Sequence, residues 1–216
     1  AVHIDHQLQQ TSARWAEQCK QAAERFDVPF KCLRVLVDRS QEGLEADARK
    51  ARYDAFRGEL GSREALLTAH HADDQLETML LALMRGAGVR GLRGMPVVQP
   101  FAGGWLVRPL LDFARSNLEA WAREQQLAWI EDPTNFSTSM DRNYVRHRLT
   151  PTLAARWPSA PLSAGRSAEH LEEASTLLDD LAAIDAELAV VQGCLEVARL
   201  RELSSARRRN LLRYWL

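Results

Sequence analysis

Residues 65–80 read ALLTAHHADDQLETML, and this stretch decides the predicted fold. Residues 65–69 are short and apolar, as in a buried strand, and they lead directly into a helical pattern that begins near His71 and ends at Gly86. A strand that runs into a helix in this way is the basic unit of a parallel sheet covered by helices.

The same order of strand and helix occurs on the N-terminal side of this stretch. Strand character is found in residues 2–4 and 30–37, and helical periodicity in residues 11–26 and 44–60. The alternation predicts an α/β fold, a parallel sheet flanked by helices, in which ligands bind at the carboxyl ends of the strands.

The chain changes character on the C-terminal side of the stretch. The pattern predicts a hairpin and then three helices, in residues 97–108, 113–126, 142–155 and 205–216. The stretch 158–165, which contains Pro, Ser and Gly, is interpreted as a linker. We therefore divide the chain into a first domain, residues 1–157, and a helical linker with the start of a C-terminal domain, residues 158–216.

The composition limits the class of protein. The chain has 216 residues, a net charge of −1 and three cysteines, and no apolar run approaches the roughly 20 residues of a membrane helix. A membrane-spanning role is therefore excluded, and scattered cysteines are typical of a reducing cytoplasm rather than of a disulfide framework. The balanced charge does not by itself indicate a nucleic-acid partner, although arginines gather in residues 199–213.

Acidic residues gather where the helix after residue 69 begins. With 3.6 residues per turn, His70, Asp74 and Glu77 fall on one polar stripe, and Asp73 lies beside it. The helix dipole offsets only about 0.3–1 kcal/mol of the repulsion per carboxylate. We therefore expect a cation, either a metal ion or an ammonium group, while simple capping of the helix by acids stays open as the alternative. Carboxylates suit magnesium better than zinc.

Two groups of arginines could meet anions. Residues 85–91 read RGAGVRG, but this glycine pattern follows a helix rather than a strand, so it is not a dinucleotide-binding fingerprint. Its arginines predict phosphate contact or ordinary surface charge. Arg142 and Arg146 lie four residues apart on one helix face, which predicts an anion between them or exposure of both to solvent.

Taken together, these segments resemble the tRNA(Ile)-lysidine synthetases, a family in the PP-loop (N-type) ATP pyrophosphatase superfamily. The matching pieces follow one another in order: AVHIDH at 1–6, GLEA at 43–46, ARKARY at 48–53, HHADDQLET at 70–78, RGAG at 85–88, RPLL at 108–111, EDPTN at 131–135, RNYVR at 142–146 and RRRNLLR at 207–213. No single piece is specific, but the ordered set is.

The resemblance implies a two-step reaction on the anticodon loop of tRNA-Ile. ATP, with Mg²⁺, adenylates the 2-carbonyl oxygen of the wobble cytidine and releases pyrophosphate, and the ε-amine of free lysine then displaces AMP to form lysidine. By position in the motifs, Asp74 and Glu77 would contact lysine, and Arg142 would complete the catalytic set by neutralising phosphate charge.

The resemblance also assigns residues to the nucleotide and to the tRNA. Those beside the adenosine or its phosphates are Asp5, His6, Arg49 and His70. Those that would contact the tRNA, in the first domain and in the start of a C-terminal tRNA-binding domain, are Arg146, Arg207 and Arg208.

Two other functions stay open from the sequence. A PP-loop tRNA thiolase also resembles residues 70–78, but such enzymes use paired cysteines or an iron–sulfur cluster, and the cysteines here are single. A non-catalytic tRNA-binding module is the second alternative. The oligomeric state is not decided by the sequence, with a homodimer as the case considered.

One piece of the family pattern is expected outside the printed sequence. The phosphate loop of the family, S-G-G-x-D-S, precedes the segment that opens this chain, so we expect the front of the protein upstream of Ala1 and the C-terminal domain beyond Leu216. Residues 1–216 alone are expected to show no ATP turnover.

Overall fold

The computed structural model describes residues 1–7, 11–37, 44–130, 132, 136–137 and 139–216. The chain divides into two compact units. Unit 1 comprises residues 1–68, 97–108 and 128–132, and unit 2 comprises residues 69–96, 109–127 and 133–216.

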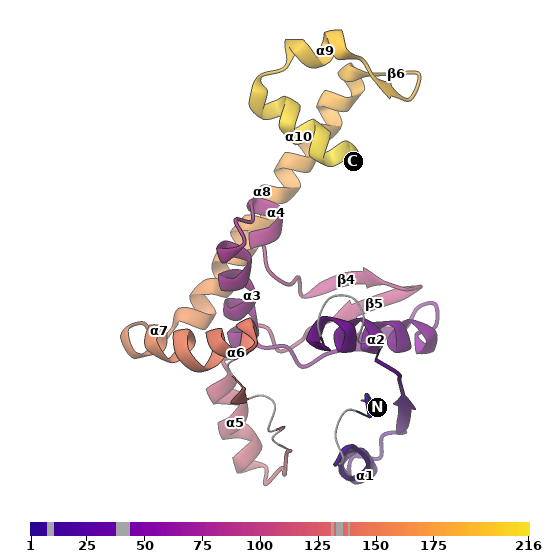
Figure 1. Cartoon of the computed structure of the whole chain (residues 1–216), viewed down its shortest axis with the longest axis vertical. Helices are drawn as coiled ribbons and strands as arrows, with labels where there is room; N and C mark the ends of the chain where they lie inside the picture. The colour runs from indigo at the N-terminus through magenta and orange to yellow at the C-terminus, as the bar shows by residue number, and fades with distance from the viewer. Residues whose placement is uncertain (8–10, 38–43, 131, 133–135, 138) are drawn as a thin grey trace. The chain divides into compact units, whose positions relative to one another are not determined.

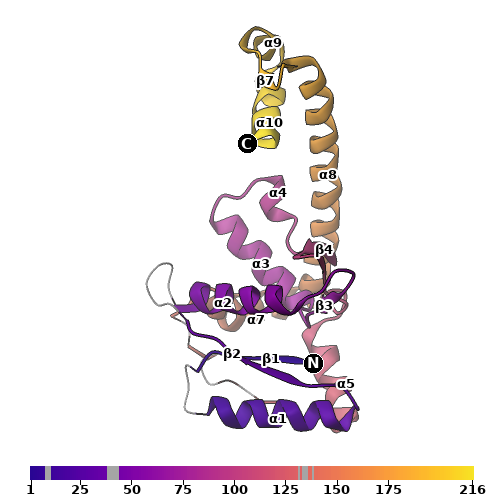
Figure 2. The ribbon, with the colours of Figure 1, turned by 90° about the vertical axis from the view of Figure 1, so that its right-hand side faces the viewer.

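The first part of unit 1 is a parallel pair of strands with a helix beside it (Figure 2). The pair consists of β1 (Val2–Asp5) and β2 (Lys31–Arg34), joined through α1 (Ser12–Arg25). Helix α1 buries Ala23, and its chain turns back where the amide of Val28 donates to the carbonyl of Ala23 at 2.9 Å. The predicted strand–helix–strand order is confirmed, although β2 is shorter than expected.

The second part of unit 1 is a three-stranded mixed sheet together with α2 (Leu44–Glu59). Strand β5 (Gly104–Val107) lies between β3 (Ala65–Leu67), which is parallel to it, and β4 (Val98–Phe101), which is antiparallel. The predicted hairpin is therefore present, but it adds an antiparallel edge to the sheet. Phe101 and Leu106 are buried in this part of the core.

Unit 2 begins with α3 (Ala72–Met84), followed by the glycine-rich loop and the short α4 (Val89–Leu92). The segment after α4 is bound to α3 by the buried side chain of Gln75. This side chain donates to the carbonyl of Met95 at 3.0 Å and accepts from the amide of Met95 at 2.8 Å. Gly94 has φ of +66°, and a Cβ there would lie 2.6 Å from Gln75 Oε1, so only glycine fits this return.

The next helices of unit 2 are α5 (Arg115–Glu124) and a run from residue 141 to residue 156. The run consists of α6 (Asp141–Tyr144), a π-helical turn labelled η2 (Val145–Leu149), and α7 (Thr150–Arg156). A π turn widens the helix locally and changes which side chains share a face. The prediction of an uninterrupted α-helix over 142–155 missed this turn.

The longest helix of unit 2 is α8 (Ala160–Ala189), along which α3, α4 and α10 (Ser205–Trp215) lie (Figures 1 and 2). Its buried face repeats every seven residues with small side chains, at Ala168, Ser175, Ala182 and Ala189. A hairpin of β6 (Val190–Val191) and β7 (Cys194–Leu195) and the helix α9 (Val197–Glu202) connect α8 to α10.

The predicted linker at 158–165 is wrong, because α8 begins at Ala160 and runs through most of it. Pro161 lies in the first turn of the helix, where the missing amide would have no helical acceptor. Gly165 is tolerated inside the helix because the helix packs along other elements over most of its length.

Candidate functional site

Asp73 and Asp74, the acidic residues at the start of α3, make different contacts. His71 precedes the first helical residue, and its amide donates to Asp74 Oδ2 at 3.1 Å. Asp73 instead accepts from the amide of Arg115 at 2.8 Å and so holds the start of α5. His70 lies before the helix, so the predicted polar stripe begins at Asp74 rather than at His70.

A cluster of four charged side chains forms between α3 and the run of helix from 141 to 156. Arg146 Nε donates to Glu77 Oε1 at 2.7 Å, and Arg142 Nε donates to Glu77 Oε2 at 3.0 Å. Arg146 Nη2 donates to Glu77 Oε2 at 2.9 Å and to Asp74 Oδ1 at 3.0 Å, while Arg142 Nη2 lies 3.5 Å from the same Asp74 oxygen. We call these four residues the α3 charge cluster.

Burial makes the α3 charge cluster stronger than a surface ion pair. The Glu77 side chain is 1% exposed and that of Asp74 is 12% exposed. Burial by itself would lower the pKa of Arg146, but the hydrogen bond to Glu77 and the charges of Glu77 and Asp74 outweigh it and raise that pKa. The two carboxylates balance the two guanidinium groups, so the cluster has no net charge.

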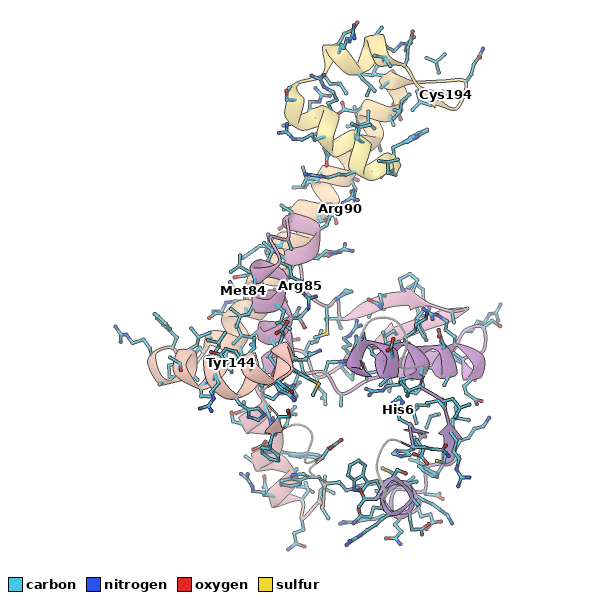
Figure 3. The ribbon with its side chains drawn as sticks, viewed as in Figure 1. His6, Met84, Arg85, Arg90, Tyr144 and Cys194 are labelled. Carbon is cyan, nitrogen blue, oxygen red and sulfur yellow. The ribbon has the colours of Figure 1, made fainter. Side chains whose placement is uncertain are left out.

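The α3 charge cluster shows which cation lies beside the acidic residues and which anion lies between the two arginines. The cations beside the acidic residues are guanidinium groups of the same chain, and the anion between Arg142 and Arg146 is the carboxylate of Glu77. Tyr144 lies between these arginines in sequence, and its side chain is exposed on α6 (Figure 3). The widened turn η2 carries Arg146, and π turns occur preferentially at functional sites.

In unit 1, Asp5 is the last residue of β1, and His6 follows it and contacts Arg52 of α2. Asp5 is 5% exposed, and its Oδ1 accepts from the amide of Gln7 at 2.9 Å. His6, labelled in Figure 3, accepts at Nε2 from Arg52 Nε at 3.4 Å. Since Nε2 accepts, the proton of the neutral ring is on Nδ1. Burial lowers the pKa of His6, and the charge of Arg52 lowers it further.

This lowered pKa predicts a pH dependence of stability. The folded state favours neutral His6, so the unfolded state binds more protons as the pH falls below about 6.5. The free energy of unfolding should therefore decrease as the pH falls from 7 to 5, because the unfolded state takes up a proton on His6 more readily than the folded state does. His6→Gln, or Arg52→Gln, should make this slope shallower in chemical denaturation at each pH. An unchanged slope in both variants would contradict the assignment.

Arg49 lies on α2 with its guanidinium carbon 4.9 Å from the centre of the Tyr53 ring. The motifs predict a role for Arg49 but none for Tyr53, Arg52 or Arg108, although all three lie within the same matching pieces of sequence. The sequence contains all three residues, but only the structure indicates which side chains they contact.

Three arginines of unit 2 outside the α3 charge cluster have carboxylate partners on α8. Arg93 Nη1 donates to Glu172 Oε1 at 3.1 Å, and Arg90, labelled in Figure 3, is paired with Asp179. Arg207 Nε donates at 3.1 Å to Asp185, whose side chain is fully buried. Its neighbour Arg208 is half-buried on α10.

The described residues contain no group of three or more His, Cys, Asp or Glu side chains that could hold a metal ion. The three cysteines are free, with Cys32 and Cys194 exposed and Cys19 half-buried. Among the helices that the structure describes, none combines the length and apolar character required to span a membrane.

A family model described as the PP-loop domain matches residues 1–153. The chain belongs to the PP-loop family. This confirms the superfamily predicted from the ordered motifs, and with it the α/β fold class. A second model, described as the TilS substrate binding domain, matches residues 195–216.

Curated relatives cover the whole chain. It is 50% identical over 217 residues to a protein named tRNA(Ile)-lysidine synthase from Alkalilimnicola ehrlichii, and 46% identical over 224 residues to one of the same name from Pseudomonas fluorescens. Each match covers 100% of this chain but 49% and 50% of the relatives, so the chain spans about half the length of the curated relatives it matches.

A solved structure shares the fold of the chain. It is described as the U34-tRNA thiolase NcsA from Methanococcus maripaludis with its [4Fe-4S] cluster. The match has a TM-score of 0.60 at 15% identity, and it covers 80% of this chain and 61% of that chain. At this identity the likeness concerns the fold and not the chemistry.

Proposed function

We propose that the protein ligates lysine to the wobble cytidine of tRNA-Ile in an ATP-dependent reaction that forms lysidine. The observation that carries the proposal is the α3 charge cluster, in which two buried carboxylates, Glu77 and the slightly more exposed Asp74, are held by two arginines. The relatives that bear the name tRNA(Ile)-lysidine synthase, 43% to 50% identical over the whole chain, support the same reaction.

The two carboxylates differ in a way that suggests a division of labour. Glu77 is surrounded by donors and uses both oxygens for Arg142 and Arg146. The Asp74 side chain is 12% exposed against 1% for Glu77, so we assign the contact with the incoming ammonium group to Asp74. In the proposed site, Asp74 holds the ε-ammonium of lysine and accepts a proton from it, while Glu77 fixes the arginines behind it.

The reaction needs two bond exchanges. In the first, the 2-carbonyl oxygen of cytidine bonds to the α-phosphorus of ATP, and pyrophosphate leaves. In the second, the lysine amine bonds to C2 of the base, and AMP leaves with the former carbonyl oxygen. Arg142 would neutralise charge that develops on the phosphate, as charge-assisted donors do in such transfers.

The remaining assignments belong to the same proposal. The residues that we assign to binding the nucleotide are Asp5, His6, Arg49 and His70, and those that we assign to binding the tRNA are Arg146, Arg207 and Arg208. We propose that Mg²⁺ is bound together with ATP, and we assign no described residue to the ion. The proposal includes a cytoplasmic location and a domain boundary after residue 157.

An assay of label transfer tests the proposed function. The protein, expressed as its gene encodes it, is incubated with ATP, tRNA-Ile and radiolabelled lysine. We expect the label to move onto the tRNA, with one AMP and one pyrophosphate released per lysine transferred. Incorporation of sulfur, or tRNA binding with no lysine transfer, would contradict the proposal and favour a thiolase or a binding module.

A further inference from the structure

Two cysteines, Cys19 and Cys32, lie on neighbouring elements of unit 1 and have no role in the proposed reaction. Both thiols are free, with Cys32 exposed on β2 and Cys19 half-buried on α1. Whether the two thiols can meet depends on which side of α1 carries Cys19 and on which face of the β1–β2 pair carries Cys32.

Cys19 belongs to the inner side of α1. The residues of this helix that are not exposed recur at helical spacing and form one stripe, which consists of Ser12, Trp15, Ala16, Cys19 and Ala23. Helix α1 packs against β1. The Cys19 thiol is therefore on the side of α1 that faces the β1–β2 pair.

Cys32 belongs to the face of the strand pair that is turned to α1. Figures 1 and 2 both show the pair between α1 and α2. The other face of the pair contacts α2, since Lys31 Nζ lies 2.6 Å from Glu59 Oε2 and His6 accepts from Arg52. Successive side chains of a strand point to opposite faces. Cys32 follows Lys31 directly, so its thiol is on the α1 side.

The electrostatics of the two thiols agree with this placement. Burial raises the pKa of Cys19, and the negative charge that Cys32 has as a thiolate raises that pKa further. Such an effect is screened within about 10 Å in ordinary salt, so it indicates that the two sulfur atoms are near each other. Cys194, an exposed thiol on β7 of unit 2, provides a comparison.

We propose that Cys19 and Cys32 form an oxidation site, which hydrogen peroxide converts to a disulfide that joins α1 to β2. The exposed Cys32 sulfur attacks one peroxide oxygen and becomes a sulfenic acid, while the other oxygen leaves as water with the thiol proton. The Cys19 sulfur then attacks the Cys32 sulfur. The S–S bond forms, and the hydroxyl group leaves as a second water with the proton of Cys19. The two thiols lose two electrons, and one peroxide molecule gains them.

Peptide mapping after oxidation tests the site. The protein, expressed as its gene encodes it, is treated with hydrogen peroxide under native conditions, its remaining thiols are blocked with iodoacetamide, and it is digested with trypsin. We expect peptide 15–20 linked to peptide 32–34, with a mass that is lower than their sum by two hydrogen atoms. Dithiothreitol, added before the blocking step, should abolish the link.

Two variants separate the roles of the thiols. Cys19→Ser should lose the link, and dimedone, which reacts with sulfenic acids, should then label Cys32, because no second thiol removes the sulfenic acid. Cys194→Ser is the matched control, since it removes an exposed thiol and should leave the link unchanged.

Three results would overturn the oxidation site. The first is oxidation of Cys32 to the sulfinic or sulfonic acid while Cys19 stays a thiol. The second is a lack of reaction at both thiols. The third is a link that forms only when peroxide is added in urea, since the two thiols would then meet only in the unfolded chain. If Cys19→Ser fails to fold, the map of the unaltered protein decides by itself.

Discussion

Replacing Glu77 by alanine should lower the free energy of unfolding by about 3–5 kcal/mol, the range for breaking a buried ion pair. The Glu77 carboxylate is 1% exposed and accepts from both Arg142 and Arg146. Its removal leaves two guanidinium groups, each about three-quarters buried, with Asp74 as their remaining carboxylate partner. Urea denaturation of the two proteins at neutral pH measures the difference.

Glu119 provides a matched control for this prediction. It also pairs with two arginines, Arg115 at 2.7 Å and Arg123 at 3.4 Å, but its side chain is 34% exposed. Glu119→Ala should cost no more than about 1 kcal/mol, as for surface ion pairs. Equal losses in the two variants would mean that burial does not distinguish the α3 charge cluster from the surface.

Replacing Gly104 by alanine should cost about 3 kcal/mol, at the upper end of the range for overpacking. A Cβ on Gly104 would overlap the carbonyl oxygen of Glu64 and lie 3.1 Å from its carbonyl carbon. The same carbonyl accepts from the amide of Trp105 at 3.0 Å, so relief of the overlap breaks the β3–β5 pairing. Thermal unfolding measures the loss.

The adjacent glycine is the control for this second prediction. A Cβ on Gly103 would lie 3.7 Å from Ser62 Cα, which is ordinary contact, and the position has no positive φ. Gly103→Ala should therefore leave the melting temperature within about 2 °C of the original value. If Gly104→Ala were as stable as Gly103→Ala, the close approach of β5 to residue 64 would be wrong.

Most helices and strands could be predicted from periodicity, because their apolar positions recur at helical or strand spacing. The predicted strand at 65–69 and the helix after it correspond to β3 and α3 within about two residues at each end. The predicted linker at 158–165 is wrong because it relied on the usual tendency of proline and glycine to interrupt a helix. In α8, a first-turn position suits Pro161, and the contacts of the helix tolerate Gly165.

The site could be predicted only in part, since spacing identifies a face but not its partner. The faces that carry Asp74 with Glu77 and Arg142 with Arg146 were both found from the sequence. That each face binds the other, across 65 or more residues, depends on the packing of α3 against the π turn.

The measurement that tests the central claim most directly follows both steps of the reaction in Asp74→Asn within a single turnover. We predict that adenylated tRNA-Ile forms and accumulates, while lysine-dependent release of AMP slows about 100-fold or more, as for the loss of a general base. The ratio of the two rates within one variant cancels any inactive fraction. Asp73→Asn, which changes the adjacent carboxylate that holds α5, should keep the original ratio. Equal slowing of both steps in Asp74→Asn, or slowing of neither, would contradict a role for Asp74 in using lysine.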